Sequence, residues 1–366
     1  HQLARGEAGG YRARTLAALL GAGADARVTR GLFEHATDGA PARLRPEVIR
    51  ELINVELGQP LDMKQLDDDL KQIYGLGFIR AANYRVLEKN GEDGLEITVR
   101  QDDRGTDFIE TGLSIASSGR GAFINLQVGY LKTDLDERGS EFRVVSQIGD
   151  NFGLLTDVFK YFDDRQRWFV NPVFFWDRRD LLLYESSQAV ASTRINEYGG
   201  GIDFGWEIGR YARIHAGISR STGDAKVQIG EPIPDFDFEA AEYQLGGIWD
   251  RLDDFYLPRR GTRARIEYVR SDESIGADTE FEQLWFSVFT NHTMGRHNVS
   301  AFGRFDTTTS GEAPVYALFT GGGFLNMSGF EPNELVGPHF GVVGLGYRYQ
   351  VLQSGFLPGY VGTTVE

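Results

Sequence analysis

The pattern of apolar and polar residues changes near residue 106. From Thr106 onward the two kinds alternate with a period of two: in the segment 109–116, Ile, Thr, Leu and Ile are separated by Glu, Gly and Ser. The same alternation recurs at 124–130, 202–208, 212–219, 264–268 and 343–350. This period is typical of strands with one apolar face. Because no helical period interrupts it, we predict hairpin connections and an antiparallel sheet.

The chain before residue 106 predicts a different kind of unit. Pro46 suits the first turn of a helix, and the apolar residues after it keep helical spacing until Gly58. Asp62 is placed to cap a second helix, which ends before Gly75. We therefore expect two consecutive helices, and we interpret the acidic run 67–69 in the second one as a solvated face.

Three short alternating segments surround these helices. They lie at 27–33, 82–88 and 95–100, the last two flanking the turn residues Asn90 and Gly91. The order β-α-α-β-β predicts a small α+β domain at 27–104. We expect a linker or the remnant of an upstream domain at 1–26, and the antiparallel sheet at 105–366.

The predicted sheet could face water or lipid. The longest apolar stretches, near 16–24 and 168–176, are shorter than the roughly 18 to 20 residues that a spanning helix needs, so a helical membrane protein is excluded. The polar face of the strands is rich in Gly, Ser, Asn and Gln, and aromatic residues gather at strand ends. This combination favours a transmembrane barrel with a polar lumen and aromatic girdles. A soluble double-sheet protein is the alternative.

Composition narrows the function. The chain has 366 residues, with 38 Lys and Arg against 53 Asp and Glu, and a formal net charge of −15. This acidic balance disfavours a nucleic-acid binder, which needs a basic face. The absence of cysteine excludes disulfides, thiolate metal sites and a cysteine nucleophile, and is compatible with an oxidising compartment.

Two segments carry a recognisable signature. The first is the turn 250–262, which contains Pro258 and Gly261; the second is the glycine-rich loop 321–330, which ends in Met327-Ser328-Gly329-Phe330 and precedes the strand 340–350. With the small domain before them, these segments resemble the BamA/TpsB superfamily. The resemblance implies periplasmic POTRA domains, a 16-stranded barrel in the Gram-negative outer membrane, and a loop that folds into the lumen between the eleventh and twelfth strands.

The signature departs from the family pattern at two positions. Ser328 stands where the family usually has Arg, and Gly346, two residues before Arg348, stands where the twelfth strand usually has an acid. Glu366 keeps the place of the thirteenth-strand acid. These departures look most like the translocator part of patatin-like autotransporters, type V secretion subtype d. The chain ends at the thirteenth strand, so we expect the C-terminal strands of the barrel to be missing.

The resemblance implies a function and its partners. We expect an outer-membrane translocator that exports an N-terminally fused passenger of the patatin-like phospholipase type. Its partners would be outer-membrane lipid, the unfolded passenger, the outer-membrane assembly machinery and periplasmic chaperones. The alternatives are an assembly factor or insertase, a two-partner secretion transporter and a passive porin. We expect the loop motif 327–330 to organise the barrel wall, with Gly346, Arg348 and Glu366 as lumen wall candidates.

No residues predict catalysis, a cofactor or a metal. The chain contains no Gly-x-Ser-x-Gly, so we expect no esterase activity. A barrel lipase would need a Ser/His pair on the exterior, and Ser219 and His215 share the polar face instead. His292 and His297 are interpreted as flanking a hairpin turn rather than as metal ligands.

Overall fold

The computed structural model describes most of the chain. The described residues are 28–31, 46–55, 61–74, 79–89, 92–101, 106–118, 121–133, 135–149, 152–185, 188–209, 211–229, 235–253, 258–323, 326–330, 333–352 and 359–366. The predicted linker at 1–26 and the predicted turn at Asn90 and Gly91 lie outside them. None of the described helices is long and apolar enough to cross a membrane.

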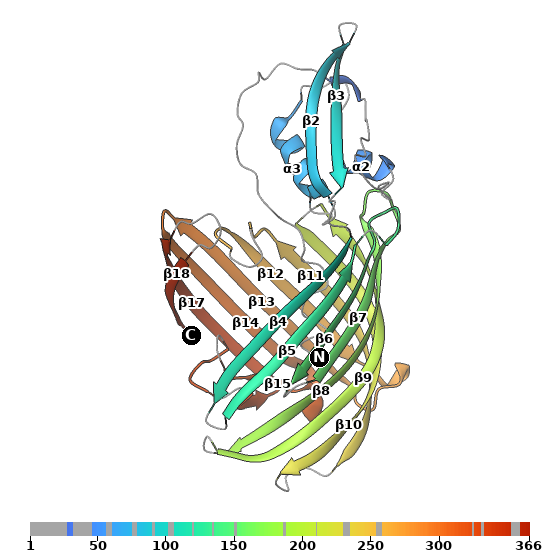
Figure 1. Cartoon of the computed structure of the whole chain (residues 1–366). Helices are drawn as coiled ribbons and strands as arrows, with labels where there is room; N and C mark the ends of the chain where they lie inside the picture. The colour runs from blue at the N-terminus through green and yellow to red at the C-terminus, as the bar shows by residue number, and fades with distance from the viewer. Residues whose placement is uncertain are drawn as a thin grey trace.

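A small α+β unit comes first (Figure 1). Its elements are β1 (Val28–Gly31), α2 (Pro46–Leu52), α3 (Met63–Tyr74), β2 (Ile79–Lys89) and β3 (Glu92–Gln101). The sheet has the order β1-β3-β2, with β1 parallel and β2 antiparallel to β3. One face of the sheet and the two helices share a core that includes Val48, Leu52, Leu66, Ile73, Leu95, Ile97 and Val99. The predicted element order is present.

Two details of this unit differ from the predictions. Helix α2 ends at Leu52, well before Gly58, because the chain turns so that the Asn54 amide donates to the Asp69 carboxylate at 2.7 Å. Asp69 also accepts from the Asn54 and Gln65 side chains and is only 2% exposed. The expected solvated face is therefore wrong for Asp69, whose carboxylate satisfies an amide left without a helical partner. Asp62 does cap α3, accepting from the Lys64 and Gln65 amides.

The rest of the chain forms one antiparallel sheet of 13 strands in the order β18-β17-β14-β13-β12-β11-β10-β9-β8-β7-β6-β5-β4. The strands are β4 (Asp107–Ser118), β5 (Gly121–Lys132), β6 (Glu141–Gly149), β7 (Phe152–Tyr161), β8 (Trp168–Glu185), β9 (Gln188–Ile208), β10 (Ala212–Ile229), β11 (Phe236–Asp250), β12 (Gly261–Ser271), β13 (Phe281–Met294), β14 (His297–Gly311), β17 (His339–Leu352) and β18 (Gly359–Val365). Each strand pairs with its neighbour in sequence apart from β14, whose partner β17 follows the short strands β15 (Phe319–Gly321) and β16 (Leu335–Gly337).

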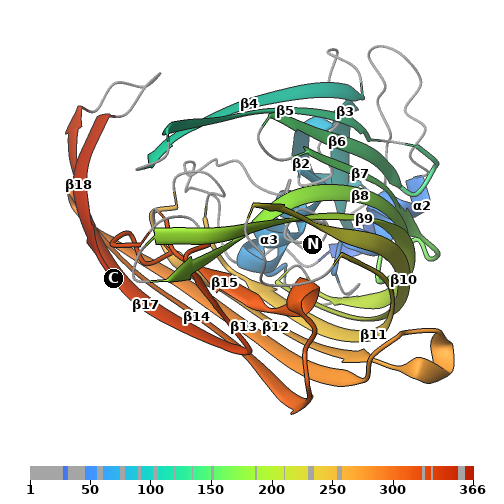
Figure 2. The same ribbon diagram turned by 90° about the horizontal axis from the view of Figure 1, so that it is seen from below.

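The sheet curves into most of a barrel, as Figure 2 shows. Strands β4 and β18 form its two edges, and no pairing joins them within the described residues. The small unit lies beyond the end of the sheet at which β4 begins (Figure 1). We call this the near end and the opposite one the far end. The predicted hairpin topology is confirmed, and the histidine pair flanks a tight β13–β14 turn at Gly295 and Arg296.

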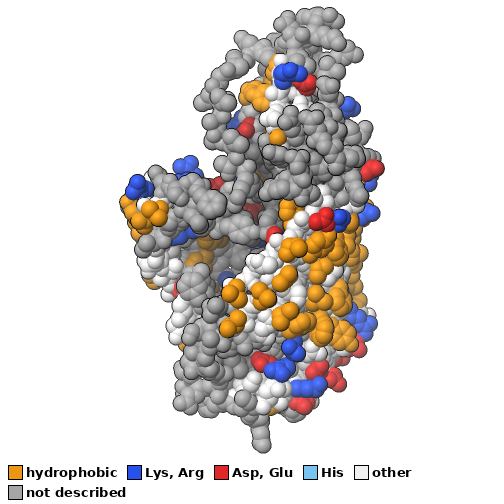
Figure 3. Space-filling view, viewed as in Figure 1, with side chains coloured by type: hydrophobic (Ala, Val, Ile, Leu, Met, Phe, Trp, Pro, Cys, Tyr) orange, Lys and Arg blue, Asp and Glu red, His pale blue; other side chains and the backbone are white. Residues whose placement is uncertain are grey.

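The two faces of this sheet invert the usual arrangement of a soluble protein. Outward-facing apolar side chains are highly exposed, with Ile109 at 76% and Val343 at 75%, whereas the inward-facing Glu197 is at 0% and Glu267 at 2%. Figure 3 shows the outward side chains as a broad apolar band around the middle of the sheet. An exposed apolar band of this size needs a partner other than water.

Aromatic side chains edge the apolar band at the near end. Trp168 stacks on both Phe204 and Trp206, with ring centroids 5.5 and 5.8 Å apart. Trp249 is also exposed there, on β11 beside Ala212 of β10. Such rings combine an apolar body with a polar edge and suit the boundary between hydrocarbon and water.

Candidate functional site

The segment between β14 and β17 folds back over the inner face of the sheet (Figure 2). It contains a single 3-10 turn, η2 (Val315–Ala317), the short hairpin of β15 and β16, and the glycine-rich loop between those two strands. We call residues 312–338 the inner loop. Three sets of contacts hold its described residues to the wall.

The first contact is made by η2. Tyr316 stacks on Phe238 of β11, with ring centroids 3.9 Å apart and planes at 10°, and packs with Ile195, Ala225 and Ala240. The carbonyl of Tyr316 accepts from Arg179 of β8 at 3.1 Å. The carbonyl of Ala317 accepts from Gln283 of β13 at 2.9 Å. Because β8 and β13 are well separated in the sheet, the inner loop bridges the far end of the concave face. Burial raises the pKa of Tyr316 to about 12.

The second contact is the hairpin of β15 and β16. Phe319 packs with Phe340 and Val342 of β17, and Trp285 of β13 covers the cluster. A Cβ added at Gly321 would lie 2.0 Å from the Phe340 ring. Glycine at this position is therefore required for the close approach of β15 to the wall. The Arg304 guanidinium of β14 lies 5.0 Å from the Phe340 ring centroid and pairs with Asp306 at 2.5 Å.

The third contact is the tip of the inner loop, which contains the predicted motif. The Ser328 amide donates to one Glu366 carboxylate oxygen at 2.7 Å, and the Ser328 hydroxyl donates to the other at 3.1 Å. Met327 has a left-handed backbone with φ of 74°, and its carbonyl accepts from the Phe330 amide. Gly329 has open space around its Cα, and Phe330 is exposed. The structure thus joins two residues that the sequence marked 38 positions apart.

The other two wall candidates have different environments. A Cβ at Gly346 would lie 2.4 Å from the Ser300 hydroxyl on β14, so Ser300 occupies the space that an acid would need. Arg348 lies nearer the near end, opposite Gly362, while Glu366 follows Val365, which is opposite Leu345. Arg348 therefore does not meet the tip of the inner loop.

Arg348 instead holds the turn before β12. Its guanidinium donates to Asn298 at 3.0 Å and to the Pro258 carbonyl at 2.9 Å. Asp253 accepts from the amides of Arg259 and Arg260, which closes the same turn, and Gly261 has φ of 114°. The segment from Pro258 to Gly261 is thus fastened to the inner wall at the near end of the sheet.

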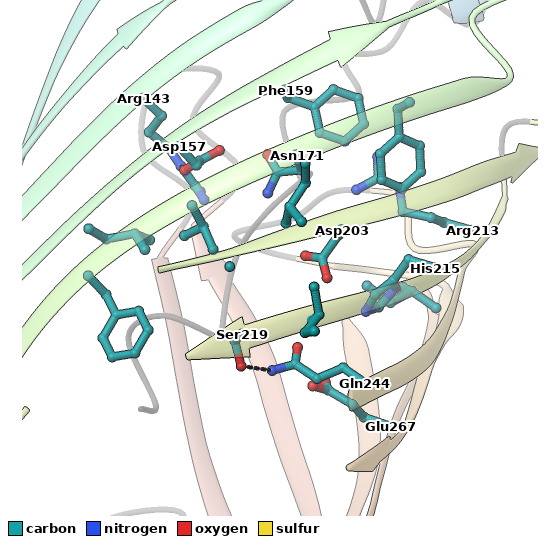
Figure 4. Close-up of a pocket in the computed structure, with 18 of the residues that line it drawn as sticks. Arg143, Asp157, Phe159, Asn171, Asp203, Arg213, His215, Ser219, Gln244 and Glu267 are labelled. Carbon is teal, nitrogen blue, oxygen red and sulfur yellow. Dashed lines mark hydrogen bonds and ion pairs between the residues drawn. The ribbon is translucent and has the colours of Figure 1, made fainter. Parts of the chain in front are cut away.

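The concave wall also contains a polar recess of about 90 Å³ (Figure 4). Arg143 pairs with Asp157 at 2.8 Å across β6 and β7. The Arg213 guanidinium lies beside the stacked Phe159 and Phe169 rings, 4.7 and 4.9 Å from their centroids, and pairs with Glu207 at 2.5 Å. Sequence reasoning did not single out these residues. Their signal was an arginine at an inward position with acids and aromatics at inward positions of neighbouring strands.

His215 and Ser219 both line this recess, as the shared polar face predicted. The Ser219 hydroxyl accepts a hydrogen bond from Gln244 at 3.0 Å. His215 and Ser219 are two inward positions apart on β10. They do not form the hydrogen-bonded pair that nucleophilic catalysis needs. Within the described residues, no three His, Asp or Glu side chains converge as metal ligands.

Comparisons with known proteins agree with this architecture. The model of the Omp85 superfamily domain matches residues 119–354, which is more than half of the chain. The chain therefore belongs to the Omp85 superfamily, whose members are outer-membrane β-barrel proteins. No curated protein matches the chain significantly.

Solved structures share the fold at low sequence identity. BamA from Haemophilus ducreyi lacking POTRA domains 1–3 matches with a TM-score of 0.63 and 15% identity, over 91% of this chain and 69% of that one. CdiB from Acinetobacter baumannii matches with a TM-score of 0.60 and 11% identity, over 93% of this chain. CdiB from Escherichia coli matches with a TM-score of 0.59 and 9% identity, over 90% of this chain. The chain spans 63% of the length of each CdiB structure. These likenesses concern the fold.

Proposed function

We propose that this protein is an outer-membrane translocator that exports an unfolded polypeptide, fused upstream as a patatin-like phospholipase passenger. The small α+β unit would act as a POTRA domain in the periplasm, at the near end. Outer-membrane lipid would cover the apolar band. The assembly machinery and periplasmic chaperones would be partners during biogenesis.

The observation that carries the proposal is the bond between Ser328 and Glu366. It fastens the tip of the inner loop to β18 with a hydroxyl and a backbone amide, in place of the arginine expected from the superfamily. A single carboxylate accepting two hydrogen bonds is a modest fastening, worth about 1.5 to 3 kcal/mol. Such a loop can stay ordered in the resting barrel and still yield to a passing chain. The wall beside it carries polar side chains, which suits the passage of an unfolded backbone.

The test uses the full-length protein with an epitope-tagged passenger in a Gram-negative host. Glu366→Ala removes both acceptors, whereas Glu312→Ala removes an exposed acid of the same inner loop and serves as the matched control. We expect Glu366→Ala to lower the passenger accessible to external protease by about fivefold. The double variant Ser328→Ala/Phe330→Ala should lower it as well. Membrane insertion should remain close to wild type in all three.

A second candidate is an assembly factor for other barrel proteins, favoured by the match to BamA over 69% of that structure. Purified protein in liposomes distinguishes the two functions. Accelerated folding of an added, unrelated outer-membrane protein, together with unchanged passenger display in Glu366→Ala, would replace the translocator proposal with the assembly function.

We also propose that the chain itself is not an enzyme. The missing Gly-x-Ser-x-Gly and the separation of Ser219 from His215 support this proposal. Hydrolysis of a short-chain nitrophenyl ester by the purified chain, lost in Ser219→Ala, would contradict it.

A further inference from the structure

The backbone ladder between β7 and β8 is interrupted inside the barrel wall. Pairing runs from the far end to Asp157 opposite Val173, stops, and resumes at Lys160 opposite Val170 in the same register. Two successive residue pairs are therefore missing between these stretches. Within the described residues, every other irregularity of the large sheet is a one-residue register shift close to a strand end. The β7–β8 interruption differs from them in kind and in place.

Pro172 accounts for the interruption. In the continued register it lies opposite Val158, and it has no N–H to donate to β7. Proline is rare in a strand with partners on both sides, and β8 also pairs with β9 along its whole length. Pro172 is exposed on the outer face between Val170 and Phe174, so the break lies within the apolar band. A backbone carbonyl left unbonded at this depth would be costly in lipid.

Side chains of the inner face replace the missing backbone bonds. In the orientation that gives both of its polar atoms complementary partners, the Asn171 amide donates to the Val158 carbonyl at 3.1 Å and to the Asp157 carboxylate at 3.3 Å. Phe159 of β7 stacks on Phe169 of β8, with ring centroids 4.6 Å apart. Both rings and the amide are buried. At the break, the two strands are thus joined by an amide and a pair of rings.

The polar recess lies on the inner side of this break. Asp157, Phe159, Phe169 and Asn171 all line it (Figure 4). Side chains that border a recess have room to change rotamer, which side chains in a close-packed interior lack. Paired stretches remain on both sides of the break, with six residue pairs toward the far end and two toward the near end. The break can therefore flex without a change of register and without separation of the strands.

We infer that the wall between β7 and β8 is a flexible joint, at which side chains in place of backbone hydrogen bonds let the near-end opening of the barrel change width. Only two residue pairs separate the joint from the near end. The β7–β8 turn beyond them is held together, because Asp163 accepts from the Arg167 and Trp168 amides at 2.9 Å each. The end of the hairpin should therefore move as one piece. The use of this joint to admit a polypeptide rests on the proposed function, whereas the joint itself does not.

Hydrogen exchange of the purified full chain in detergent tests the joint. Pro172→Val supplies the missing N–H, so exchange of the segment 156–160 should slow about fivefold. Asn171→Ala removes the bond to the Val158 carbonyl and should speed exchange about fivefold. Ile202→Val is the matched control, because Ile202 lies opposite Pro172 in the unbroken β8–β9 ladder; exchange there should stay within about twofold of wild type. Heat-modified gel mobility checks that the variants are folded.

Distances between two spin labels measure the width of the opening. The natural chain has no cysteine, so labels can be attached through cysteines at Arg165 and Arg296, in the near-end turns of β7–β8 and β13–β14. We expect a broad distance distribution in wild type and in Ile202→Val, and a narrower one in Pro172→Val. With an epitope-tagged passenger on the full-length protein, Pro172→Val should lose surface display, and Ile202→Val should keep it.

Four results would overturn the inference. If the wild-type segment 156–160 exchanges as slowly as the unbroken segment 200–204, the side chains fasten the break as firmly as backbone bonds do. If folded Pro172→Val exchanges like wild type, the proline is not the cause. Slower exchange with an unchanged distance distribution would mean that the opening keeps its width. Slower exchange and a narrower distribution with unchanged display would remove the joint from export, and the Glu366→Ala variant tests the proposed function separately.

Discussion

The outer and inner faces of the large sheet are built from the same strands, yet they obey opposite rules. On the outer face large apolar side chains are exposed, such as Ile109, Leu245 and Val343. On the inner face carboxylates such as Glu197, Glu267 and Asp306 are almost completely covered, each with polar or cationic neighbours. The difference shows that the strands separate two solvents, with hydrocarbon outside and a polar lumen inside.

The inner face is also the only one of the two that the inner loop covers within the described residues. The loop is held there by specific devices: the Tyr316–Phe238 stack, the Gly321–Phe340 approach and the Ser328–Glu366 bond. The outer face has no such devices, because lipid is a fluid partner. A substitution on the outer face should therefore change stability through the transfer of its side chain into lipid. A substitution on the inner face should change stability through the loss of a defined contact.

The largest effect is expected from a charge placed in the apolar band of the outer face. Leu245→Arg places a cation in the middle of the apolar band on β11 and should lower the free energy of unfolding by about 2 to 4 kcal/mol. Gln244→Arg, its inward-facing neighbour, is the matched control and should change it by less than about 1 kcal/mol. Guanidinium unfolding in lipid vesicles measures both. Equal losses would mean that the two faces are not in different solvents.

The next effect tests the paired charges of the inner face. Arg304→Ala leaves Asp306, which is 2% exposed, without its ion-pair partner and should destabilise the protein by about 2 kcal/mol. Arg304→Ala/Asp306→Asn should recover part of that loss, because it removes the uncompensated charge. The same unfolding assay applies. A double variant that is less stable than the single one by a further 2 kcal/mol would contradict a paired inner face.

A smaller effect concerns the seating of the inner loop. Gly321→Ala should displace β15 from Phe340 and cost about 1 to 2 kcal/mol, because the Cβ has no room. Gly329→Ala, at the open tip, should be neutral. Limited proteolysis of the inner loop should be accelerated only in the first variant. If the inner loop of both variants is cut at the wild-type rate, β15 does not pack against Phe340 in the membrane.

The smallest effect is a dependence on high pH. Burial raises the pKa of Tyr316 to about 12, above its usual value of about 10. The undocked loop would therefore ionise first, so docking is at full strength below pH 10 and weakens as the pH rises from 10 to 12. Proteolysis of the inner loop at graded pH should show this loss. Tyr316→Phe, which cannot ionise, should show no loss over that interval.

Much of the fold could be predicted from the sequence, because a single physical signal carries it. The period of two set the faces of the strands in which it was read, and the strand predicted after the glycine-rich loop agrees with the structure. The predicted helix cap is confirmed where the side chain caps its own helix, as Asp62 does. The predicted end of α2 was wrong because Asp69, a residue of another helix, binds the chain just after Leu52.

The site could be predicted only in part for the same reason. The motif at Ser328 and the acid at Glu366 are local signals, and the structure brings the two residues into contact. That the motif organises the barrel wall stays a prediction. The role of Arg348 at Pro258 and the seating of Tyr316 on Phe238 depend on cross-strand register and on how far the sheet curves. Neither is encoded in the spacing of one segment.

Single-cysteine scanning of β10 tests the central claim most directly, and the natural chain has no cysteine to interfere. Cysteines would be placed one at a time at residues 212–219 in the membrane-inserted protein. We predict that His215, Gly217 and Ser219 positions react with a water-soluble maleimide, while fluorophores at Ile214, Ala216 and Ile218 positions are quenched by lipid-phase quenchers. Uniform reactivity along the strand, without this alternation, would contradict a sheet that separates lipid from a polar lumen.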